Sequence, residues 1–583
     1  MPNRPWYTLP IPLALLKLSA IRDRLRQHNL HDTSKLPVEA GLPRPVADAA
    51  EVNLGARSAD GSYNDLLHPE MGMAGTRFGR NVPLEAAVAD EANLLKPNPR
   101  KISQSLLARK EFIPATILNL NAASWIQFQT HDWFSHGKNQ PHNQHEVPIE
   151  KGDTWEHERP MVVDKTLNDP SRPAAEDGLP KTFVNTETHW WDASQIYGST
   201  PEMVEKLRSH VDGKMRLEAD GFLPIDPDLG IDLVAFSGTW WIGLSMLHTL
   251  FVREHNAISD HLKAAYPGWN DRKLFDHARL INAALIAKIH TVEWTPAILP
   301  NPVTEMAMNV NWWGILGRDF RKAFGRIGNS EILSGIVGST TDHHTAPYYL
   351  TEEFTSVYRM HPLIPDGYEF YSCLNDAHLG SRPFIDGFDK HTRPLTEEIG
   401  FANLFYSFGL AHPGAVTLHN YPDFLRNLPK PNGEVFDLAS VDILRDRERG
   451  VPRYNRFREL IGRGRVSSFE EITSNPDRAR ELREVYDNDV NQVDLMIGLY
   501  SEDLPPGFGF SETAFWVFIL MASRRLKSDR FFTNDYRAGI YTQEGLDWIE
   551  NNSMVSVLKR HHPELTPALR GIDNAFKPWR RVR

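Results

Sequence analysis

The stretch EEFTSVYRMHPLIPD, residues 352–366, places Tyr358 three positions before His361 in a run with the apolar pattern of a helix. Residues three positions apart share one face of an α-helix, with about 5–6 Å between their Cβ atoms. A tyrosine and a histidine, both capable of redox chemistry, would then point to the same side of the helix. Spacing alone favours two buried core residues. Whether they belong to a functional site instead depends on motifs elsewhere in the sequence.

The sequence around this stretch is predominantly helical in pattern. Residues 272–294, 401–412 and 511–532 carry apolar side chains at intervals of three to four, and few stretches alternate as strands do. The 41 prolines and 38 glycines indicate long irregular loops between the helices. No Gly/Ser linker, low-complexity tract or repeat divides the 583 residues. We therefore predict one large, mainly α domain with long loops, a natural host for a buried cofactor.

Composition and charge exclude some classes of partner. The net charge of −11 and the pI near 6.1 argue against nucleic acid as the main partner. The single cysteine, Cys373, rules out an intrachain disulfide framework and favours a reducing compartment, so a cytoplasmic location is predicted. No feature indicates an obligatory protein partner.

The N-terminal segment has a distinct pattern. Apolar residues recur at helical spacing beside basic ones between positions 9 and 26; they are Leu15, Leu18, Ile21 and Leu25. Such a helix either lies on a membrane surface as a peripheral contact or docks on the core of its own protein. The segment lacks the pattern of a signal peptide, and no apolar run approaches the roughly 18–20 residues of a membrane span. We predict an N-terminal segment, residues 1–45, followed by one large domain, residues 46–583.

An aromatic-rich helix, SWIQFQTHDWFSHG (residues 124–137), carries candidate catalytic groups. Gln127 and His131 share one helical face, whereas Asp132 points about 100° away. A histidine with a glutamine beside it to hold a water suits acid–base work on a small ligand such as a peroxide. The alternative is a core histidine on an aromatic helix.

The segment TETHWWDASQIYGS (residues 186–199) has the pattern of a calcium loop. Its oxygen-bearing groups at alternate positions are Thr188, the Trp190 carbonyl, Asp192 and Ser194. An extended loop would aim all four oxygens to one side, and hard oxygen ligands at six to eight coordination are what Ca²⁺ takes. Asp132 is a candidate second carboxylate. The alternative is a polar turn capped by Asp192.

Two more segments complete a family resemblance: MLHTLFVREHNAI (246–258) and VDILRDRERGVPRYNRFREL (441–460). Together with the motifs above, in the same order, they resemble the animal-type haem peroxidase and cyclooxygenase superfamily. HWWDASQIYGS (189–199), IAKIHTVEWTPAIL (286–299) and MASRRLKSDRFFT (521–533) look most like its fatty-acid α-dioxygenases. The resemblance runs from about residue 115 to residue 535, and it implies a haem peroxidase-like catalytic domain.

The resemblance assigns a role to each candidate residue. His361 matches the proximal ligand of the haem iron, and Tyr358 matches the tyrosine that is oxidised to a radical. His131, with Gln127 beside it, matches the distal histidine. Asp442 falls where the family places the partner of the proximal histidine.

For the substrate carboxylate the resemblance implies His290, Thr295 and Arg525, with the adjacent Arg524 as the alternative cation. Because His290 and Thr295 are five residues apart, they do not share a face of a regular helix. The helix is therefore expected to be distorted near Thr295, just before Pro296.

Departures from the wider superfamily narrow the prediction. Thr130 stands where mammalian peroxidases have an ester-forming aspartate, so haem b is expected without that ester. No arginine precedes the MLHTL run in AFSGTWWIGLSMLHTL (235–250), which disfavours efficient cleavage of hydrogen peroxide. The disulfide-rich module of cyclooxygenases is incompatible with one cysteine. The missing arginine and the missing disulfide-rich module both favour an α-dioxygenase.

The expected reaction uses a fatty acid, O₂ and a peroxide activator. The Tyr358 radical would abstract the α-hydrogen, O₂ would add, and a 2-hydroperoxy fatty acid would result. Alternatives are a peroxidase that oxidises small donors, a cyclooxygenase-like dioxygenase acting at another carbon, and a non-catalytic haem-binding or calcium-binding protein.

Overall fold

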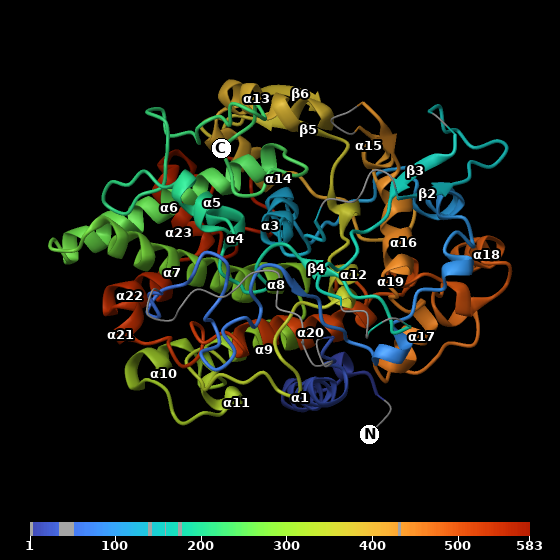
Figure 1. Ribbon diagram of the computed structural model, residues 1–583. Helices are drawn as coiled ribbons and strands as arrows, with labels where there is room; N and C mark the ends of the chain where they lie inside the picture. The colour runs from blue at the N-terminus through green and yellow to red at the C-terminus, as the bar shows by residue number, and fades with distance from the viewer. Residues whose placement is uncertain are drawn as a thin grey trace.

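Helices form most of the fold (Figure 1), and the prediction of a mainly α protein is confirmed. The computed structural model describes residues 4–33, 52–137, 143–157, 159–172, 176, 178–429 and 433–582. The helices are α1 (Ile11–His28), α2 (Pro99–Ile102), α3 (Leu120–Thr130), α4 (Ser194–Tyr197), α5 (Pro201–Leu207), α6 (Ile242–Ala265), α7 (Asp271–Ile289), α8 (Thr295–Ile298), α9 (Pro302–Trp313), α10 (Gly317–Phe324), α11 (Glu331–Ser334), α12 (Glu352–Val357), α13 (Thr392–Ile399), α14 (Phe401–Leu410), α15 (Asp423–Arg426), α16 (Leu438–Glu448), α17 (Tyr454–Leu460), α18 (Pro476–Val485), α19 (Leu495–Ser501), α20 (Glu512–Lys527), α21 (Ala538–Tyr541), α22 (Gln543–Asn551) and α23 (Met554–His561).

The strands pair into short antiparallel ribbons. The pairs are β1 (Thr76–Arg77) with β4 (Val184–Asn185), β2 (Gln144–Val147) with β3 (Met161–Asp164), β5 (Gly367–Tyr371) with β6 (His378–Pro383), and β7 (Leu428–Pro429) with β8 (Val435–Phe436). Helices α3, α12 and α20 lie in the middle of the molecule, with α6 and α7 on one side and α16 and α19 on the other (Figure 1). The central helices therefore carry the buried residues from which a site can be built.

The segment that contains Tyr358 and His361 is not one continuous helix. α12 ends at Val357, Tyr358 is its C-cap, and a 3₁₀ turn starts at His361. Pro362 explains this break, because a proline ring in an α-helix clashes with the carbonyl four residues earlier, which here is that of Tyr358. The expectation that the two side chains share a helical face is therefore wrong.

A π-helical turn interrupts the helix that carries the predicted substrate anchor. α7 ends at Ile289, the π-turn spans His290–Trp294, and α8 begins at Thr295. Hydrogen bonds in a π-turn join residues five apart, and such turns occur frequently at functional sites. The predicted distortion is present immediately before Thr295, and it places His290 and Thr295 on the same side.

The N-terminal helix α1 docks on the body of the protein. Leu18, Ile21 and Leu25 are buried, and Leu15 is partly buried against the same core. Of the two alternatives for this apolar stripe, the structure shows the docked one. The predicted domain boundary at residues 45 and 46 lies outside the described residues. Within the described ranges, no helix is long and apolar enough to cross a membrane.

Candidate active site

His361 lies against a buried carboxylate. Its Nδ1 is 2.7 Å from Oδ2 of Asp442 on α16, and the same carboxylate accepts hydrogen bonds from Arg359 and, at 2.9 Å, from Tyr421. Burial by itself raises the pKa of Asp442, but the charges of His361 and Arg359 outweigh it, so this pKa is lowered. The His361 side chain is 32% exposed. With Nδ1 turned to Asp442, Nε2 is the nitrogen available to a metal, and the carboxylate increases its basicity.

His131 follows the last residue of α3 and has one free ring nitrogen. Its Nε2 contacts the carbonyl of Gly238, and its Nδ1 is buried with no hydrogen-bond partner among the described residues. A carbonyl only accepts, so Nε2 carries the proton and Nδ1 is a free base. Burial lowers the pKa of His131 to about 4, which keeps the ring neutral at neutral pH.

Gln127 lies one helical turn before His131 and is held by two neighbours. Its Oε1 accepts from Trp241 Nε1 at 2.8 Å, and its Nε2 donates to Thr239 at 3.1 Å. One lone pair and one N–H of the amide remain for a water or a small ligand. Thr130, which lies between Gln127 and His131 in the sequence, donates its hydroxyl to the carbonyl of Ile126 at 3.0 Å.

A cavity of about 250 Å³ lies beside the start of α3 and the segment that follows His361. It is lined by Leu120 at the start of α3, by Pro365–Glu369 shortly after His361, and by Ser407, Phe408, Ala411 and His412 of α14 and the loop after it; neither His131 nor His361 is among its lining residues. The observation that fits a haem ligand is therefore the His361 ring itself, with Nδ1 on Asp442 and Nε2 available.

Tyr358 is packed among aromatic rings. Its ring centroid is 4.9 Å from that of Phe354 and 5.6 Å from that of Trp133. Burial raises the pKa of Tyr358, and the nearby charge of Arg525 offsets part of this shift. The phenol therefore stays protonated, so it can lose a hydrogen atom but does not ionise readily.

His290 presents an unsatisfied donor. Trp125 Nε1 donates to its Nδ1 at 3.2 Å, and an indole N–H only donates, so the proton of the neutral ring is on Nε2. This Nε2 is buried and has no hydrogen-bond partner in the described part of the chain. Burial and then the charge of Arg525 lower the pKa of His290 to about 3. A buried N–H without an acceptor is costly, and a carboxylate oxygen would satisfy it.

The two adjacent arginines of α20 differ in their partners. Arg524 donates to the carbonyls of His343, Ala346 and Pro347. Arg525 donates from Nη2 to the Trp190 carbonyl at 2.9 Å, whereas its Nε and Nη1 have no partner among the described residues. The Arg525 guanidinium lies 3.7 Å above the Trp133 ring. Of the two candidates, Arg525 is the one that can receive an anion.

A second cavity, of about 310 Å³, is lined mainly by apolar side chains; His290 and Thr295 are in its wall, and Arg525 lies behind Trp191 of that wall. Its inner wall includes Trp191, His290 and Thr295, and its outer wall includes residues of α1, α9 and α20. Phe518 of α20 both lines the cavity and contacts the Tyr358 ring, with centroids 6.3 Å apart. Thr295 donates its hydroxyl to the carbonyl of His290 at 2.9 Å, so it must rotate to donate to a ligand.

The predicted calcium ligands come together, although their loop is bent rather than extended. Ala193 adopts the left-handed conformation and α4 begins at Ser194. The Thr188 hydroxyl donates to Asp192 Oδ2 at 3.0 Å, and the Ser194 N–H donates to Asp192 Oδ1 at 3.2 Å. The Trp190 carbonyl instead accepts the bond from Arg525. The expectation of four alternating oxygens on one side of an extended strand is therefore wrong.

Asp132 is a buried carboxylate without a well-formed hydrogen bond to any described residue. Burial first, and then the charges of Glu187 and Asp192, raise its pKa to about 8, while a contact with Ser194 acts in the opposite direction. Asp192 already has Arg279 3.7 Å from its carboxylate, so it is Asp132 that needs a cation or a proton. No group of three His, Cys, Asp or Glu ligands occurs among the described residues, so a cation here would depend on hydroxyl and carbonyl oxygens as well.

Sequence reasoning missed two tryptophans that organise the site. Trp125 sets the tautomer of His290, and Trp133 contacts Tyr358, His290 and Arg525. Both belong to the SWIQFQTHDW motif, so their presence was visible. Their partners are 157 to 392 residues away in sequence, and no local pattern reveals such contacts.

Known proteins resemble this chain in sequence and in fold. Residues 56–572 match the family model for animal haem peroxidases. The chain is 38% identical to an α-dioxygenase of Oryza sativa subsp. japonica, across 98% of this chain and 93% of the relative. It superposes on the crystal structure of a fatty acid α-dioxygenase of Arabidopsis thaliana with a TM-score of 0.91 at 36% identity, covering 99% of this chain and 90% of the other.

A structure of the Oryza sativa fatty acid α-dioxygenase, a tyrosine-to-phenylalanine variant with palmitic acid, matches with a TM-score of 0.90 at 36% identity, covering 98% of this chain and 94% of that chain. The chain therefore belongs to the animal haem peroxidase family, within it to the α-dioxygenases, and is a haem-binding oxidoreductase.

Proposed function

We propose that the protein is a fatty-acid α-dioxygenase that converts a fatty acid and O₂ into a 2-hydroperoxy fatty acid. The observation that carries the proposal is the unsatisfied donor His290 Nε2–H in the wall of an apolar cavity. The Arg525 guanidinium, whose Nη1 also lacks a partner among the described residues, lies 5.3 Å from the ring of Trp191 in the same wall. The rice relative with palmitic acid supports the same substrate class.

The anchor explains why the α-carbon would react. A carboxylate held by Arg525 and His290 has its hydrocarbon tail in the apolar cavity. Trp133 contacts the rings of both His290 and Tyr358, with centroids 6.3 Å and 5.6 Å away. The atom next to an anchored carboxylate is therefore the first carbon within reach of Tyr358, which disfavours a cyclooxygenase-like reaction further along the chain.

Tyr358 would take the hydrogen atom. Haem, when bound, supplies the oxidising power that makes the Tyr358 phenoxyl radical after activation by a peroxide. The radical removes the α-hydrogen and becomes a phenol, O₂ adds to the carbon radical, and the phenol returns a hydrogen atom to the peroxyl group. Because the raised pKa of Tyr358 keeps its O–H intact, the hydrogen is available for this return.

The residues that would hold haem b and handle the peroxide are His361 and His131. His361 Nε2 would bind the iron with Asp442 behind it, and His131 Nδ1 would accept the peroxide proton while Gln127 orients the peroxide. The Thr130 hydroxyl is bonded to the helix backbone, which supports haem without an ester at this position.

We also propose a structural calcium ion at Asp132, Thr188, Asp192 and Ser194, without the Trp190 carbonyl, which is bonded to Arg525. The unsatisfied carboxylate of Asp132 and its raised pKa support a cation here. The ion would tie the calcium loop to the helix that carries His131.

The test is to incubate haem-loaded protein with a saturated fatty acid and identify the oxygenated carbon by mass spectrometry. We expect a 2-hydroperoxy acid and its breakdown products. Brisk oxidation of phenols without fatty-acid oxygenation would instead establish the small-donor peroxidase. In parallel, His361→Ala should lose most of the Soret absorption, and an unchanged haem spectrum would contradict the ligand assignment.

A further inference from the structure

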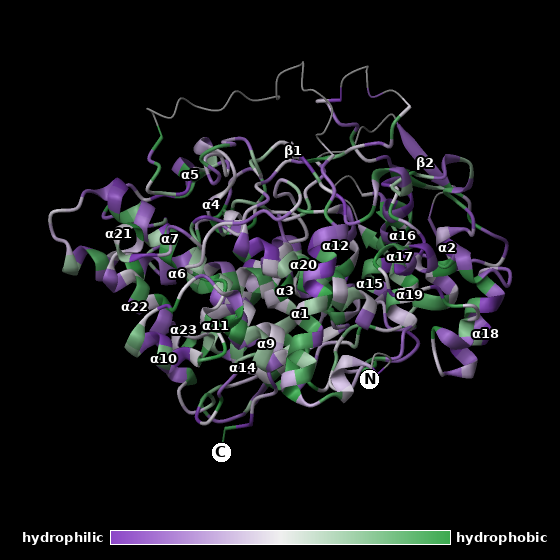
Figure 2. Cartoon of the chain, turned by 90° about the horizontal axis from the view of Figure 1, so that it is seen from below, coloured by the Kyte–Doolittle hydropathy of each residue, from purple (hydrophilic) through white to green (hydrophobic). Residues whose placement is uncertain are grey.

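Large apolar side chains are exposed on one face of the molecule. We define the rim surface as Ile11, Leu13 and Leu16 of α1, Met306 of α9, Ile315, Leu316, Phe324 and Ile327 of α10 and its flanking loops, and Ile332 and Leu333 of α11; each is exposed. α1, α10 and α11 lie along the lower edge of the molecule in Figure 1, and Figure 2 views this side. Phe324 is 73% exposed and Leu16 is 63% exposed. Exposed apolar residues that occur together, rather than singly, indicate an interaction surface.

The rim surface surrounds the mouth of the fatty-acid cavity. Leu16, Ile315 and Ile332 line the 310 Å³ cavity and are also exposed to solvent. The backbone N–H of Ile315 donates to the carbonyl of Ile332 at 2.8 Å, so these two residues are held side by side. A ligand leaving the cavity at this point would therefore meet the exposed apolar residues before it met bulk water.

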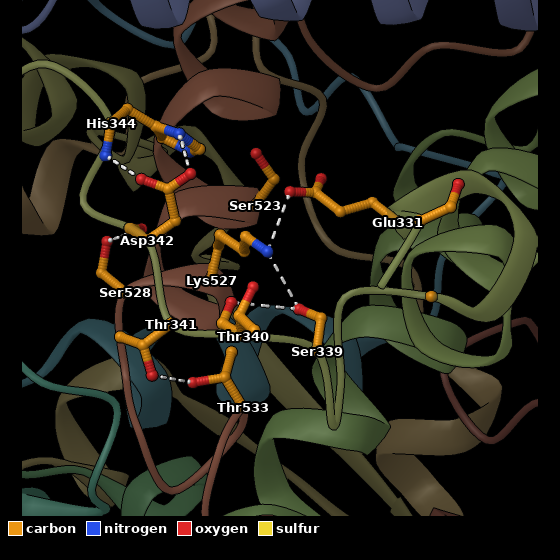
Figure 3. A network of polar contacts seen from close by, with 12 residues as sticks. Glu331, Ser339, Thr340, Thr341, Asp342, His344, Ser523, Lys527, Ser528 and Thr533 are labelled. Carbon is orange, nitrogen blue, oxygen red and sulfur yellow. Dashed lines mark hydrogen bonds and ion pairs between the residues drawn. The ribbon is translucent and has the colours of Figure 1, made fainter. Parts of the chain in front are cut away.

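An ion cluster holds the pieces of the rim surface together. Glu331 of α11 is 3.3 Å from Arg22 and 3.1 Å from Arg26 of α1, and 3.5 Å from Lys527 of α20 (Figure 3). Lys527 also donates to Ser339 at 3.0 Å. These groups are largely buried, so their attraction is screened less than that of surface pairs. α1 and α11 are thereby fixed together, and exposed Leu16 of α1 and Ile332 of α11 line the same cavity.

The charge around the rim surface is opposite to that of the whole protein. Outside the buried ion cluster, residues 4–28 contain three Lys or Arg residues and one acidic residue, and residues 314–334 contain four basic residues and one acidic residue. The complete chain carries −11. A basic zone with exposed leucine, isoleucine and phenylalanine on an otherwise acidic protein matches an anionic lipid surface in both charge and polarity.

We infer that the rim surface docks on an anionic lipid bilayer, so that the fatty acid enters the cavity directly from the lipid. The inference deepens the proposed function and rests on it for the identity of the ligand. It does not use the apolar stripe that the sequence singled out, because Leu18, Ile21 and Leu25 are buried. The docking residues are the opposite face of α1 together with the α9–α11 region.

The test is co-sedimentation of the full-length protein with phosphatidylcholine vesicles, with and without phosphatidylglycerol. Wild type should bind the vesicles that contain phosphatidylglycerol, and salt should weaken this binding. Leu316→Ser/Phe324→Ser should lower the partition coefficient by about tenfold or more, since each side chain would lose its burial in lipid. The matched control is Leu374→Ser, which changes an equally exposed (73%) residue between β5 and β6, at the opposite edge in Figure 1; it should bind as wild type does.

Vesicle binding is measured without turnover, so it is separable from the fatty-acid proposal. If wild type does not bind either vesicle, or if Leu374→Ser and the rim variant lose binding equally, the docking inference is overturned. Sedimentation velocity tests a second copy of the chain as the occupant: a wild-type dimer that Leu316→Ser/Phe324→Ser converts to a monomer would also overturn it. If docking holds and the protein oxygenates fatty acids, the rim variant should raise KM for vesicle-borne substrate only.

Discussion

Replacing Arg525 by methionine tests the substrate anchor most directly. Methionine keeps an unbranched apolar side chain between Trp133 and Trp191 but removes the guanidinium. Arg525 is 1% exposed. Once the guanidinium is removed, a carboxylate bound there would be a buried charge without a counter-ion. Removing one partner of such a buried charge pair costs about 2–5 kcal/mol. At 1.4 kcal/mol per tenfold, this corresponds to about a 30-fold to several-thousandfold loss of kcat/KM for a fatty acid.

The loss should be specific to substrates with a carboxylate. Oxidation of a small phenol and the haem spectrum should change little in Arg525→Met, because neither uses the anchor. Arg524→Met is the matched control: Arg524 bonds three backbone carbonyls, so its loss should reduce stability without selective loss of fatty-acid use. The reasoning is refuted if Arg525→Met oxygenates fatty acids at the wild-type kcat/KM, or if phenol oxidation falls by the same factor.

Three further predictions follow from the site. Tyr358→Phe should keep the haem and abolish fatty-acid oxygenation, because only the transferable O–H is lost; a rate near wild type, measured as O₂ uptake, would move the radical elsewhere. Chelation of calcium should lower the melting temperature and haem retention together, and Asp132→Asn should remove this sensitivity; metal analysis that finds no calcium in active protein would contradict the site. Burial lowers the pKa of His131 to about 4 and of His248 to about 3, below the ordinary value of 6.5. Since the unfolded chain then binds more protons as the pH falls below about 6.5, the free energy of unfolding should decrease from pH 7 toward pH 4, by about 1.4 kcal/mol per pH unit for each such histidine; denaturant titrations in which His248→Phe leaves this slope unchanged would contradict the assignment to His248.

Local sequence determined the helices and the features that interrupt them. The apolar period of residues 401–412 and 511–532 predicted α14 and α20, because an amphipathic helix repeats within one short segment. The five-residue spacing of His290 and Thr295 indicated the distortion that the structure resolves as a π-turn. Pro362 is the residue that ends α12 at Val357, but the apolar pattern of the segment suggested a helix that continues past it.

Tertiary structure decided which candidates can act. Arg524 and Arg525 are adjacent and identical in type. Arg524 is bonded to backbone carbonyls, whereas Arg525 has two nitrogens without a partner among the described residues and can therefore bind an anion. The apolar stripe of α1 was correctly recognised as one face of a helix, but periodicity does not reveal what covers that face; here the protein core does. The tautomer of His290 depends on an indole 165 residues away. Dihedral and steric preferences act over a few residues and are therefore legible in the sequence, whereas hydrogen-bond partners and burial depend on contacts that exist only after the chain has folded.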